Sequence, residues 1–522
     1  MKAGERPWPQ LISLVSAPLL WLAYPGGGDC WPLLALALVP LFLCLTRMSG
    51  PQAFGAGLAF GTLHYLLQLY WIVTVLGHYG GLPSSLAVLA LLLLTGYMAV
   101  YIAGFALMAR ALLLGGSSLV ALVAIPALWV GGDWLRGWLF SGFPWMDIGY
   151  ALAYQPWAIQ LAELFGHGSV SYLLVLLNTL LTLVFLHRGR PRRLGSPLVL
   201  SALLFAAVAL YSGWRWQDLT KTMASPATAH MAVGIVQGNI DQDVKWSPEN
   251  QQRTLTTYIR SSQALWQAER PPELIVWPET ALPFYPQVSA GLAPLTRLVA
   301  RFDAPILTGA PWFEATGPER KDIRYYNSAQ LLAPDGLFVA SYYKSHLVPF
   351  GEYVPLRKFL PFLSPLVEAV GDFTPGQVER PLVWRESRIG VLICFESIFA
   401  DISRKWSQSG ANLLVNLTND AWYGKSSAPH HSMAMTIFRA VETRRSIVRS
   451  ANTGISGFID PLGRLDDPSP LFVTWAKARS VVLLDGQSVF VRWGYLFPRC
   501  CLLVGLALTL TATAGRRGTT NR

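Results

Sequence analysis

The sequence predicts a multi-span α-helical membrane domain, a water-facing layered α/β domain and one last membrane helix. Three observations lead to this fold class. Residues 1–215 hold only ten of the 41 Lys and Arg residues and five of the 30 Asp and Glu residues. The same part repeats apolar runs close to the roughly 20 residues that cross a bilayer. From about Ala229 the pattern changes to short apolar strands between helical stretches, which is typical of a layered α/β domain.

Eight apolar runs are the expected membrane spans. They lie near residues 9–25, 31–46, 53–77, 85–109, 117–136, 168–187, 196–213 and 494–514. Seven belong to the predicted membrane domain, residues 1–215, and the eighth forms the predicted last helix, residues 493–515. The first run follows Lys2 and Arg6 and could be a signal peptide. We favour a retained span, because further apolar runs follow and no small-residue cleavage site is clear.

The basic residues of the membrane part indicate its topology. Eight spans place five basic segments on one side: Lys2 with Arg6, Arg47, Arg110, the loop 187–193, and the C-terminal tail with Arg516, Arg517 and Arg522. The intervening short loops lack Lys and Arg. Because short basic loops stay in the cytoplasm, the sequence predicts that the α/β domain lies on the outer face. The net charge of +11 therefore reflects topology, and we expect no nucleic-acid binding.

The α/β domain is expected to span residues 229–490. β-branched and aromatic residues at period-2 spacing, separated by turn signals, identify its strands. The predicted strands are Met231–Gln237, Glu273–Trp277, Pro305–Thr308, Ser328–Leu332, Leu337–Tyr342, Ser387–Cys394, Asn412–Leu417, Ile447–Ser450 and Gly457–Asp460. Helical stretches are predicted near Ser247–Glu269, Ala293–Phe302 and His431–Arg445.

Of the five cysteines, only Cys394 lies in the polar part of the chain. That part therefore offers no second thiol for an internal disulfide. The sequence contains no CxxC pair and no HExxH motif. The pair His430-His431 lacks nearby Cys or acidic spacing, which is more typical of a solvated or structural role. We therefore expect neither a metal site nor a cofactor.

Three chemically versatile side chains each follow a predicted strand: Glu279, Lys344 and Cys394. We expect them to converge at one sheet edge. A thiolate can attack a carbonyl after a carboxylate has accepted its proton, and a fixed ammonium can stabilise the oxyanion and lower the pKa of the thiol. Taken singly, each has a plainer interpretation: a buried apolar cysteine, a helix-start carboxylate and a solvated loop lysine.

An aromatic segment between two expected spans lies at a membrane edge. It runs from Asp133 to Trp145, includes Trp134 and Trp138, and continues to about His167. Its tryptophans fit an interfacial aromatic belt. The alternative is that the segment shapes a path for lipid beside the polar domain, with Trp138 and Trp145 in contact with substrate.

Four motifs carry a resemblance to a known family. They are Trp277-Pro-Glu279-Thr, Lys344-x-His346-Leu-Val-Pro-Phe-Gly-Glu352, Cys394-Phe-Glu396 and Asn416-Leu-Thr-Asn419-Asp420-Ala-Trp422-Tyr-Gly. With them, the chain closely resembles the bacterial apolipoprotein N-acyltransferases, which are membrane members of the nitrilase (carbon–nitrogen hydrolase) superfamily. The Glu–Lys–Cys set points only to the superfamily, whereas the long lysine motif and the eight expected spans point to the family. The resemblance covers essentially the whole chain and implies a nitrilase-like α-β-β-α sandwich.

The resemblance implies an acyl transfer in two steps. Cys394 would take the sn-1 acyl chain of a phospholipid as a thioester, and the α-amino group of a lipoprotein's S-diacylglyceryl cysteine would then accept it. Glu279 would be the proton acceptor and Lys344 the oxyanion stabiliser. The partners would be a phospholipid donor, a diacylglyceryl-lipoprotein acceptor and membrane lipids. The likeness also implies the bacterial cytoplasmic (inner) membrane, with the catalytic domain facing the periplasm.

Further residues match family positions. Glu352 matches a second carboxylate that orients the lysine or the base, and Glu396 matches another essential carboxylate. Trp246 matches a tryptophan on a loop over the site. Phe395 stands where tyrosine often follows the nucleophile, so the resemblance does not carry a hydroxyl role to this position.

Two other functions fit the same residues. In a membrane-tethered amidase or nitrilase, water would attack the thioester, whereas a transferase must exclude water until an amine arrives. The aromatic segments favour shielding by lipid. A catalytically inactive receptor or scaffold would tolerate loss of Glu279, Lys344 or Cys394, and all three are present.

Overall fold

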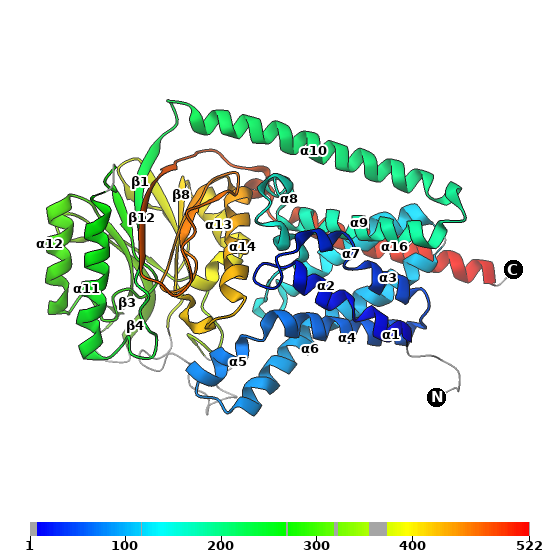
Figure 1. Cartoon of the computed structure of the whole chain (residues 1–522), viewed down its shortest axis with the longest axis horizontal. Coiled ribbons are helices and arrows are strands. Elements are labelled where there is room, and N and C mark those ends of the chain that lie inside the picture. The colour runs from blue at the N-terminus through cyan, green and yellow to red at the C-terminus, as the bar shows by residue number, and fades with distance from the viewer. Residues whose placement is uncertain (1–7, 116, 268–269, 318–321, 354–372, 521–522) are drawn as a thin grey trace.

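The computed structural model describes residues 8–115, 117–267, 270–317, 322–353 and 373–520. Lys2 and Arg6, which precede the first expected span, lie outside this part. A helical part meets a two-sheet sandwich, and the long helix α10 (Gly195–Ala224) runs along the helical part and leads into strand β1 (His230–Gln237) of the sandwich (Figure 1).

Apolar helices build the helical part. Five of the described helices are long and apolar enough to cross a membrane: α6 (Ser84–Leu114), α7 (Ser118–Arg136), α9 (His167–His187), α10 and α16 (Leu496–Thr520). A sixth candidate is the pair of α4 (Gly50–Leu69) with Ile72–Tyr79, which bends by 60° at its break. These helices indicate a membrane protein.

The first two expected spans differ from the observed helices. Short helices α1 (Trp8–Ser13) and α2 (Ser16–Ala23) stand in place of the first, and η1 (Trp31–Ala35) with α3 (Val39–Leu45) in place of the second. Proline occupies the first turn of both η1 and α3. Proline cannot donate the N–H that would continue a preceding helix, so the second run is divided before α3. The count of eight spans stays a prediction.

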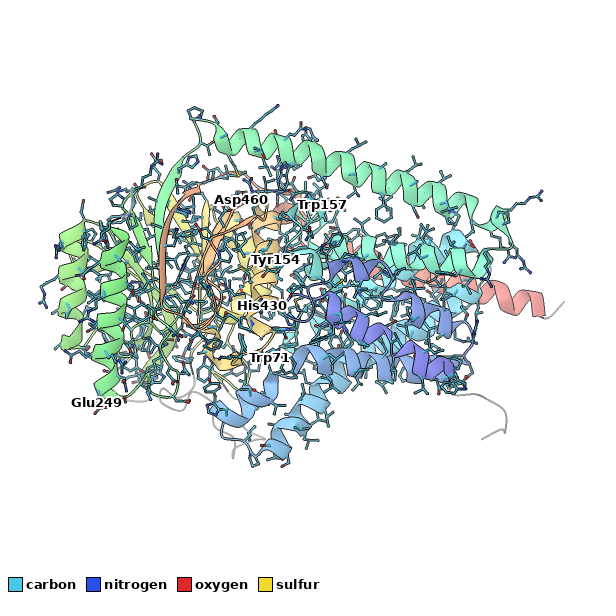
Figure 2. All side chains as sticks on the ribbon, viewed as in Figure 1. Trp71, Tyr154, Trp157, Glu249, His430 and Asp460 are labelled. Carbon is cyan, nitrogen blue, oxygen red and sulfur yellow. The ribbon has the colours of Figure 1, made fainter. Side chains whose placement is uncertain are left out.

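The bend after α4 brings the chain to the sandwich. It is followed by the single turn α5 (Ile72–Thr74) and the π-helical turn η2 (Val75–Tyr79). Trp71, at the bend, packs edge-on against Tyr423 with ring centroids 4.8 Å apart. Trp71 thus marks the boundary between the two parts, whereas Glu249 lies at the far end of the sandwich (Figure 2).

Between α7 and α9 the chain forms short turns along this boundary. They are η3 (Leu139–Ser141), η4 (Ile148–Leu152), η5 (Pro156–Ala158) and α8 (Ala162–Phe165). Trp145 and Tyr150 from this segment are buried. The segment is therefore part of the protein interior where the helical part meets the sandwich.

The α/β part is a four-layer sandwich. Among the described residues, one sheet has the order β12-β1-β2-β3-β4-β5 and the other β11-β10-β9-β8-β7-β6. The strands are β1 (His230–Gln237), β2 (Leu274–Val276), β3 (Ile306–Ala315), β4 (Ile323–Leu332), β5 (Phe338–Tyr343), β6 (Leu382–Trp384), β7 (Ser387–Ile393), β8 (Leu413–Thr418), β9 (Ser446–Ala451), β10 (Gly457–Ile459), β11 (Leu465–Asp466) and β12 (Trp475–Val482). Helices α11 (Pro248–Leu265) and α12 (Ala293–Phe302) cover the first sheet, and α13 (Ala400–Gln408) and α14 (Ala428–Thr443) cover the second (Figure 1).

Parallel strands form the centre of each sheet. β1, β2 and β3 run parallel, as do β7, β8 and β9. β2 and β8 are buried throughout, which explains their short, continuous apolar runs. The carboxyl ends of parallel strands meet at one edge, where α/β proteins place their binding sites.

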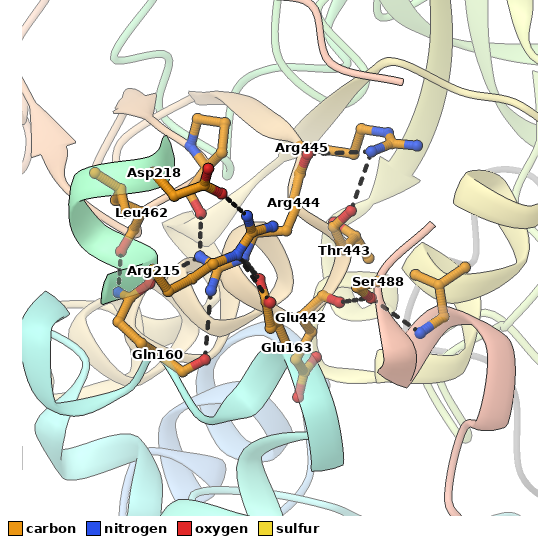
Figure 3. A network of polar contacts seen from close by, with 12 residues as sticks. Gln160, Glu163, Arg215, Asp218, Glu442, Thr443, Arg444, Arg445, Leu462 and Ser488 are labelled. Carbon is orange, nitrogen blue, oxygen red and sulfur yellow. Dashed lines mark hydrogen bonds and ion pairs between the residues drawn. The ribbon is translucent and has the colours of Figure 1, made fainter. Parts of the chain in front are cut away.

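Helix α14 is the layer that faces the helical part. All its residues are buried except His430, which is half-buried. Just beyond its end, Arg444 donates to Glu163 of α8. Arg215 of α10 donates to the same carboxylate at 2.9 Å (Figure 3). Two arginines and one glutamate from distant segments thus tie the sandwich to the helices.

Candidate active site

Four side chains at strand ends face a common cavity. Glu279 follows β2 and Lys344 follows β5 in the first sheet, whereas Cys394 follows β7 and Asn419 follows β8 in the second. All four line a cavity of about 420 Å³. The sequence predicted convergence at the edge of one sheet. The structure instead forms the site between two facing sheets, a packing that no local pattern specifies.

Cys394 occupies a strained turn. β7 ends at Ile393, one residue earlier than predicted, and Cys394 begins the short 3-10 helix η9 (Cys394–Ile398). The φ angle of Cys394 is +51°, in the left-handed region that side chains rarely adopt. Such strain persists only where the surrounding structure holds it, and it concentrates at functional sites.

A buried network of carboxylates and lysine lies in the same cavity wall. The Lys344 ammonium is 2.9 Å from Glu352 Oε2 and 3.6 Å from Glu279 Oε1. Asn327 of β4 donates from Nδ2 to Glu279 Oε1 at 2.8 Å and to Glu352 Oε1 at 2.7 Å. The Asn419 N–H donates to Glu279 Oε2 at 3.0 Å. Groups from both sheets therefore fix the position of the Glu279 carboxylate.

Close backbone packing supports the turn that carries Glu279. A side chain at Gly309 of β3 would place its Cβ 2.6 Å from Glu279 Cα and 2.3 Å from Thr280 N. Thr280 has a φ of +50°. Only glycine allows β3 to approach so closely, so Gly309 helps to hold Glu279 in place.

Glu396 is fully buried and does not line the cavity. Its carboxylate accepts hydrogen bonds from the Ile393 N–H at 2.7 Å and from both the N–H and the hydroxyl of Ser345 at 2.7 Å. The Tyr342 hydroxyl donates to it at 2.8 Å. Glu396 therefore joins the Cys394 turn to the loop that carries Lys344, which fits a positioning residue.

Burial and the Glu279 charge leave the Cys394 thiol protonated at rest. Burial, reinforced by the charge of Glu279, raises the pKa of Cys394 to about 12, against the opposing effect of Lys344. The lysine thus acts in the expected direction, but burial and Glu279 outweigh it. Burial also disfavours the Lys344 ammonium, yet Glu352 and Glu279 hold the pKa of Lys344 well above its ordinary value. A nucleophilic Cys394 consequently needs a base within the site.

Lys245 is a second lysine in the cavity wall. It is fully buried, and its Nζ donates to the backbone oxygen of Glu279 at 3.4 Å. Burial lowers the pKa of Lys245 to about 8, only partly offset by Glu279. Neither Lys245 nor Asn327 has a local signal in the sequence that predicts a role in the site. The packing of distant segments buries both residues, and a local pattern does not report that packing.

The far walls of the cavity come from the helical part. They include Trp71, Val75, Leu94 and Tyr97 from the bent segment and α6, together with Leu139, Phe140 and Phe143 from the η3 region. The Phe143 ring stacks on Phe395, next to Cys394, with centroids 6.2 Å apart. One cavity thus joins polar strand ends to the apolar surfaces of candidate membrane helices.

Of the three tryptophans expected to contact substrate, Trp246 lines this cavity. Trp145 does not line it. Its side chain is 1% exposed, and its indole N–H donates to His431 Nδ1 at 3.2 Å at the boundary between the helical part and the sandwich. Trp138 is 65% exposed and lines a second cavity instead. Trp138 and Trp145 therefore do not line the main cavity, and their contact with substrate stays a prediction.

Comparison with known proteins first defines the class of the sandwich. Residues 232–466 match the family model described as Carbon-nitrogen hydrolase, so the α/β part is a carbon–nitrogen hydrolase domain. Residues 16–180 match the Apolipoprotein N-acyltransferase N-terminal domain. Among solved structures, an amidase from Nesterenkonia sp. AN1 aligns at 20% identity and a TM-score of 0.36, covering 51% of this chain and 94% of that chain.

Full-length relatives then narrow the class. The apolipoprotein N-acyltransferase of Geobacter metallireducens is 39% identical over 97% of this chain and 95% of the relative. The apolipoprotein N-acyltransferase of Methylococcus capsulatus is 36% identical over 93% of this chain and 92% of the relative. This chain therefore belongs to the apolipoprotein N-acyltransferase family, a family of acyltransferases, which confirms the resemblance found in its motifs.

Proposed function

We propose that this protein transfers an acyl chain from a phospholipid to the α-amino group of a lipoprotein's S-diacylglyceryl cysteine. The observation that carries the proposal is the cavity that joins Cys394, Glu279 and Lys344 to apolar walls on α6 and the bent segment. Such walls suit an acyl chain, because burial stabilises each CH₂ by about 0.8 kcal/mol. The names of the relatives supply the lipoprotein acceptor.

In the first half-reaction, the Cys394 sulfur attacks the sn-1 ester carbonyl while Glu279 accepts the thiol proton. The Lys344 ammonium stabilises the oxyanion of the tetrahedral intermediate. The bond between the carbonyl carbon and the glycerol oxygen then breaks, and Glu279 returns the proton to that oxygen. A lysophospholipid leaves and a thioester remains on Cys394. The protonated resting thiol supports this need for a base.

In the second half-reaction, the lipoprotein amine attacks the thioester carbon and Glu279 accepts a proton from the amine. The C–S bond breaks, Cys394 regains its proton, and an amide is formed. Water in place of the amine would release free fatty acid. The cavity wall contains Phe143, Phe395 and Trp246, which support exclusion of water while the thioester awaits the amine.

The supporting residues have separate tasks in this proposal. Glu352 holds the Lys344 ammonium, consistent with their 2.9 Å contact. Glu396 positions the nucleophile turn relative to the lysine loop. Trp246 contacts lipid within the cavity.

We further propose that the sandwich faces the periplasm from the bacterial inner membrane. This arrangement uses eight spans, seven in residues 1–215 and one in 493–515, with the catalytic domain at 229–490. The basic loop between α9 and α10 lies at the end of the helical part remote from the sandwich, which supports opposite sides for the two (Figure 1). A reporter active only outside the cytoplasm should be active when fused near Ser289 and silent near Arg190. The reverse pattern would contradict this topology.

The transfer itself can be tested by intact mass. Protein incubated with phospholipid should gain one hydroxylamine-labile acyl chain on Cys394. A diacylated lipopeptide with a free N-terminal amine should then discharge the chain and become triacylated, whereas its N-acetylated form should leave the adduct intact. Free fatty acid produced at the same rate with and without lipopeptide would identify a hydrolase and refute the proposal.

A further inference from the structure

A second cavity, of about 260 Å³, lies where the ends of three candidate spans meet the sandwich. Its wall includes residues near the end of α7, the start of α9 and the start of α16, together with Phe399 and Asp401 from the sandwich. Glu279, Lys344 and Cys394 do not line it. Span ends lie at the depth of lipid headgroups, and tryptophans gather at that depth. The position of this cavity therefore suits a polar group that belongs to a lipid.

Asp133 of α7 lines this cavity and has an unused acceptor. Its side chain is 10% exposed, and its Oδ1 accepts a hydrogen bond from Arg136 at 3.3 Å. Its buried Oδ2 has no hydrogen-bond partner among the described residues. Leaving a buried acceptor unsatisfied costs about 1–3 kcal/mol, and more for a charged group. The Oδ2 atom therefore favours a ligand that donates a hydrogen bond and carries positive charge.

The neighbouring carboxylate is already engaged and does not compete for such a ligand. Asp147 accepts from Arg136 and, at 3.0 Å, from His167 Nε2. The other ring nitrogen of His167 lies 3.1 Å from Glu442 Oε1 of α14. Because both carboxylates are acceptors, His167 bridges them by donating from both nitrogens. Asp401, the other carboxylate of this wall, pairs with Arg404 and Lys405, so an incoming donor is directed to Asp133.

Arg499 of α16 supplies the opposite charge at the rim of the cavity. Its guanidinium lies over the Trp134 ring, 5.4 Å from the centroid, and no carboxylate of the described residues pairs with it. The Trp134 ring stacks on Trp138 at 6.0 Å with an angle of 6° between the planes. A guanidinium presents parallel N–H donors that match phosphate oxygens. The rim is therefore suited to a phosphate.

We propose that this cavity binds the headgroup of a phospholipid with a primary ammonium, as ethanolamine lipids have, at a site separate from the donor at Cys394. The ammonium donates to Asp133 Oδ2, and the phosphate pairs with Arg499. A quaternary ammonium has no N–H to donate, and a glycerol headgroup has no positive charge. Trp138 and Phe165, exposed by 65% and 40% at the same rim, provide apolar surface for the start of the acyl chains.

The proposed site is connected to the main cavity through one arginine. Arg136, which holds Asp133 Oδ1, also donates to the Phe143 backbone oxygen at 2.7 Å. Phe143 lines the main cavity and stacks on Phe395. A headgroup bound to Asp133 is therefore linked to the segment that shapes the acyl site by two hydrogen bonds, both donated by Arg136.

Lipid counting by native mass spectrometry tests this proposal. Full-length protein with Cys394→Ser, which cannot form a thioester, is freed of lipid and titrated with ethanolamine, choline or glycerol phospholipids. The ethanolamine lipid should bind in one more copy than the other two. Asp133→Asn and Arg499→Gln should each weaken that extra copy about tenfold or more, because each removes one charge-assisted contact.

Arg492→Gln is the matched control, since Arg492 is an exposed arginine of α15 (Val489–Trp493) that does not line the cavity. It should keep the extra copy. Equal binding of the three headgroups, or an extra copy unchanged by Arg499→Gln, would overturn the proposal. Arg499 is exposed, so its substitution tests the site even where Asp133→Asn disturbs folding. Because acyl transfer is measured separately, failure here leaves the proposed function standing.

Discussion

Two buried ion networks in this protein contain the same kinds of group and differ in what surrounds them. At the junction between the helical part and the sandwich, Glu163 accepts hydrogen bonds from Tyr211, Arg215 and Arg444, so protein donors surround its carboxylate (Figure 3). In the main cavity, Glu279 and Lys344 approach only to 3.6 Å, and both face open volume. The comparison suggests that a network enclosed by protein donors holds domains together, whereas one that also faces a cavity is available for chemistry.

The largest effect should come from the thiol, which belongs only to the cavity network. Cys394→Ser should abolish the acyl adduct and transfer, because a hydroxyl is far less acidic than a thiol and Glu279 cannot activate it equally. Intact mass after incubation with phospholipid measures the adduct, and Cys44→Ser is a control in a buried cysteine of α3. An adduct that persists in Cys394→Ser and disappears in Cys44→Ser would reverse the assignment.

The same substitution in each network tests the comparison directly. Glu279→Gln should slow adduct formation by about 10²–10⁴-fold, the usual contribution of a general base, while the protein remains folded. The rate comes from a time course of intact mass, and thermal unfolding reports the fold. If Glu279→Gln formed the adduct at a near-normal rate, Glu279 would not be the general base.

Glu163→Gln, in contrast, should leave the rate of the folded protein close to normal and lower its stability. Breaking a buried ion pair on one side leaves the partner arginines uncompensated, which costs about 3–5 kcal/mol. Denaturant unfolding of the purified protein in detergent measures this loss. A Glu163→Gln protein with wild-type stability but impaired transfer would contradict the division between the two networks.

The sequence predicted the central strands and the strand-end residues well for a physical reason. β2 and β8 are buried on both faces, so they must be short apolar runs. β12, an edge strand, was missed because it carries Lys477 and Arg479 and lacks such a run. β3 extends past Thr308 although Pro311 signals a strand end, because β4 pairs with it as far as Ala315.

The site could be predicted only as far as its residues have a local signal. Glu279, Lys344 and Cys394 stand directly after strands that the pattern identified. Asn327, which bonds both carboxylates, lies within β4, and its amide acquires a role only when two turns fold over it. Likewise, burial of Lys245 depends on contacts with the Glu279 turn, which no spacing along the chain encodes.

The smallest effect, and the sharpest test of the difference between the networks, concerns Lys245. The pKa of this buried lysine is lowered to about 8 from an ordinary 10.5, so the folded protein holds an ammonium against the cost of burial. Below about pH 8 that cost is present in full. As the pH rises toward 10.5, the folded protein releases the proton before the unfolded chain does, and the cost disappears.

Lys245→Met should therefore be more stable than wild type at pH 7, by about 3 kcal/mol for a shift of this size. This difference in stability should close as the pH approaches 10.5. Thermal unfolding at both pH values measures the gap, and Lys221→Met, at an exposed position on α10, should show no such pH-dependent difference. Wild type at least as stable as Lys245→Met at pH 7 would show that the cavity network is as well compensated as the junction, and the distinction between them would fail.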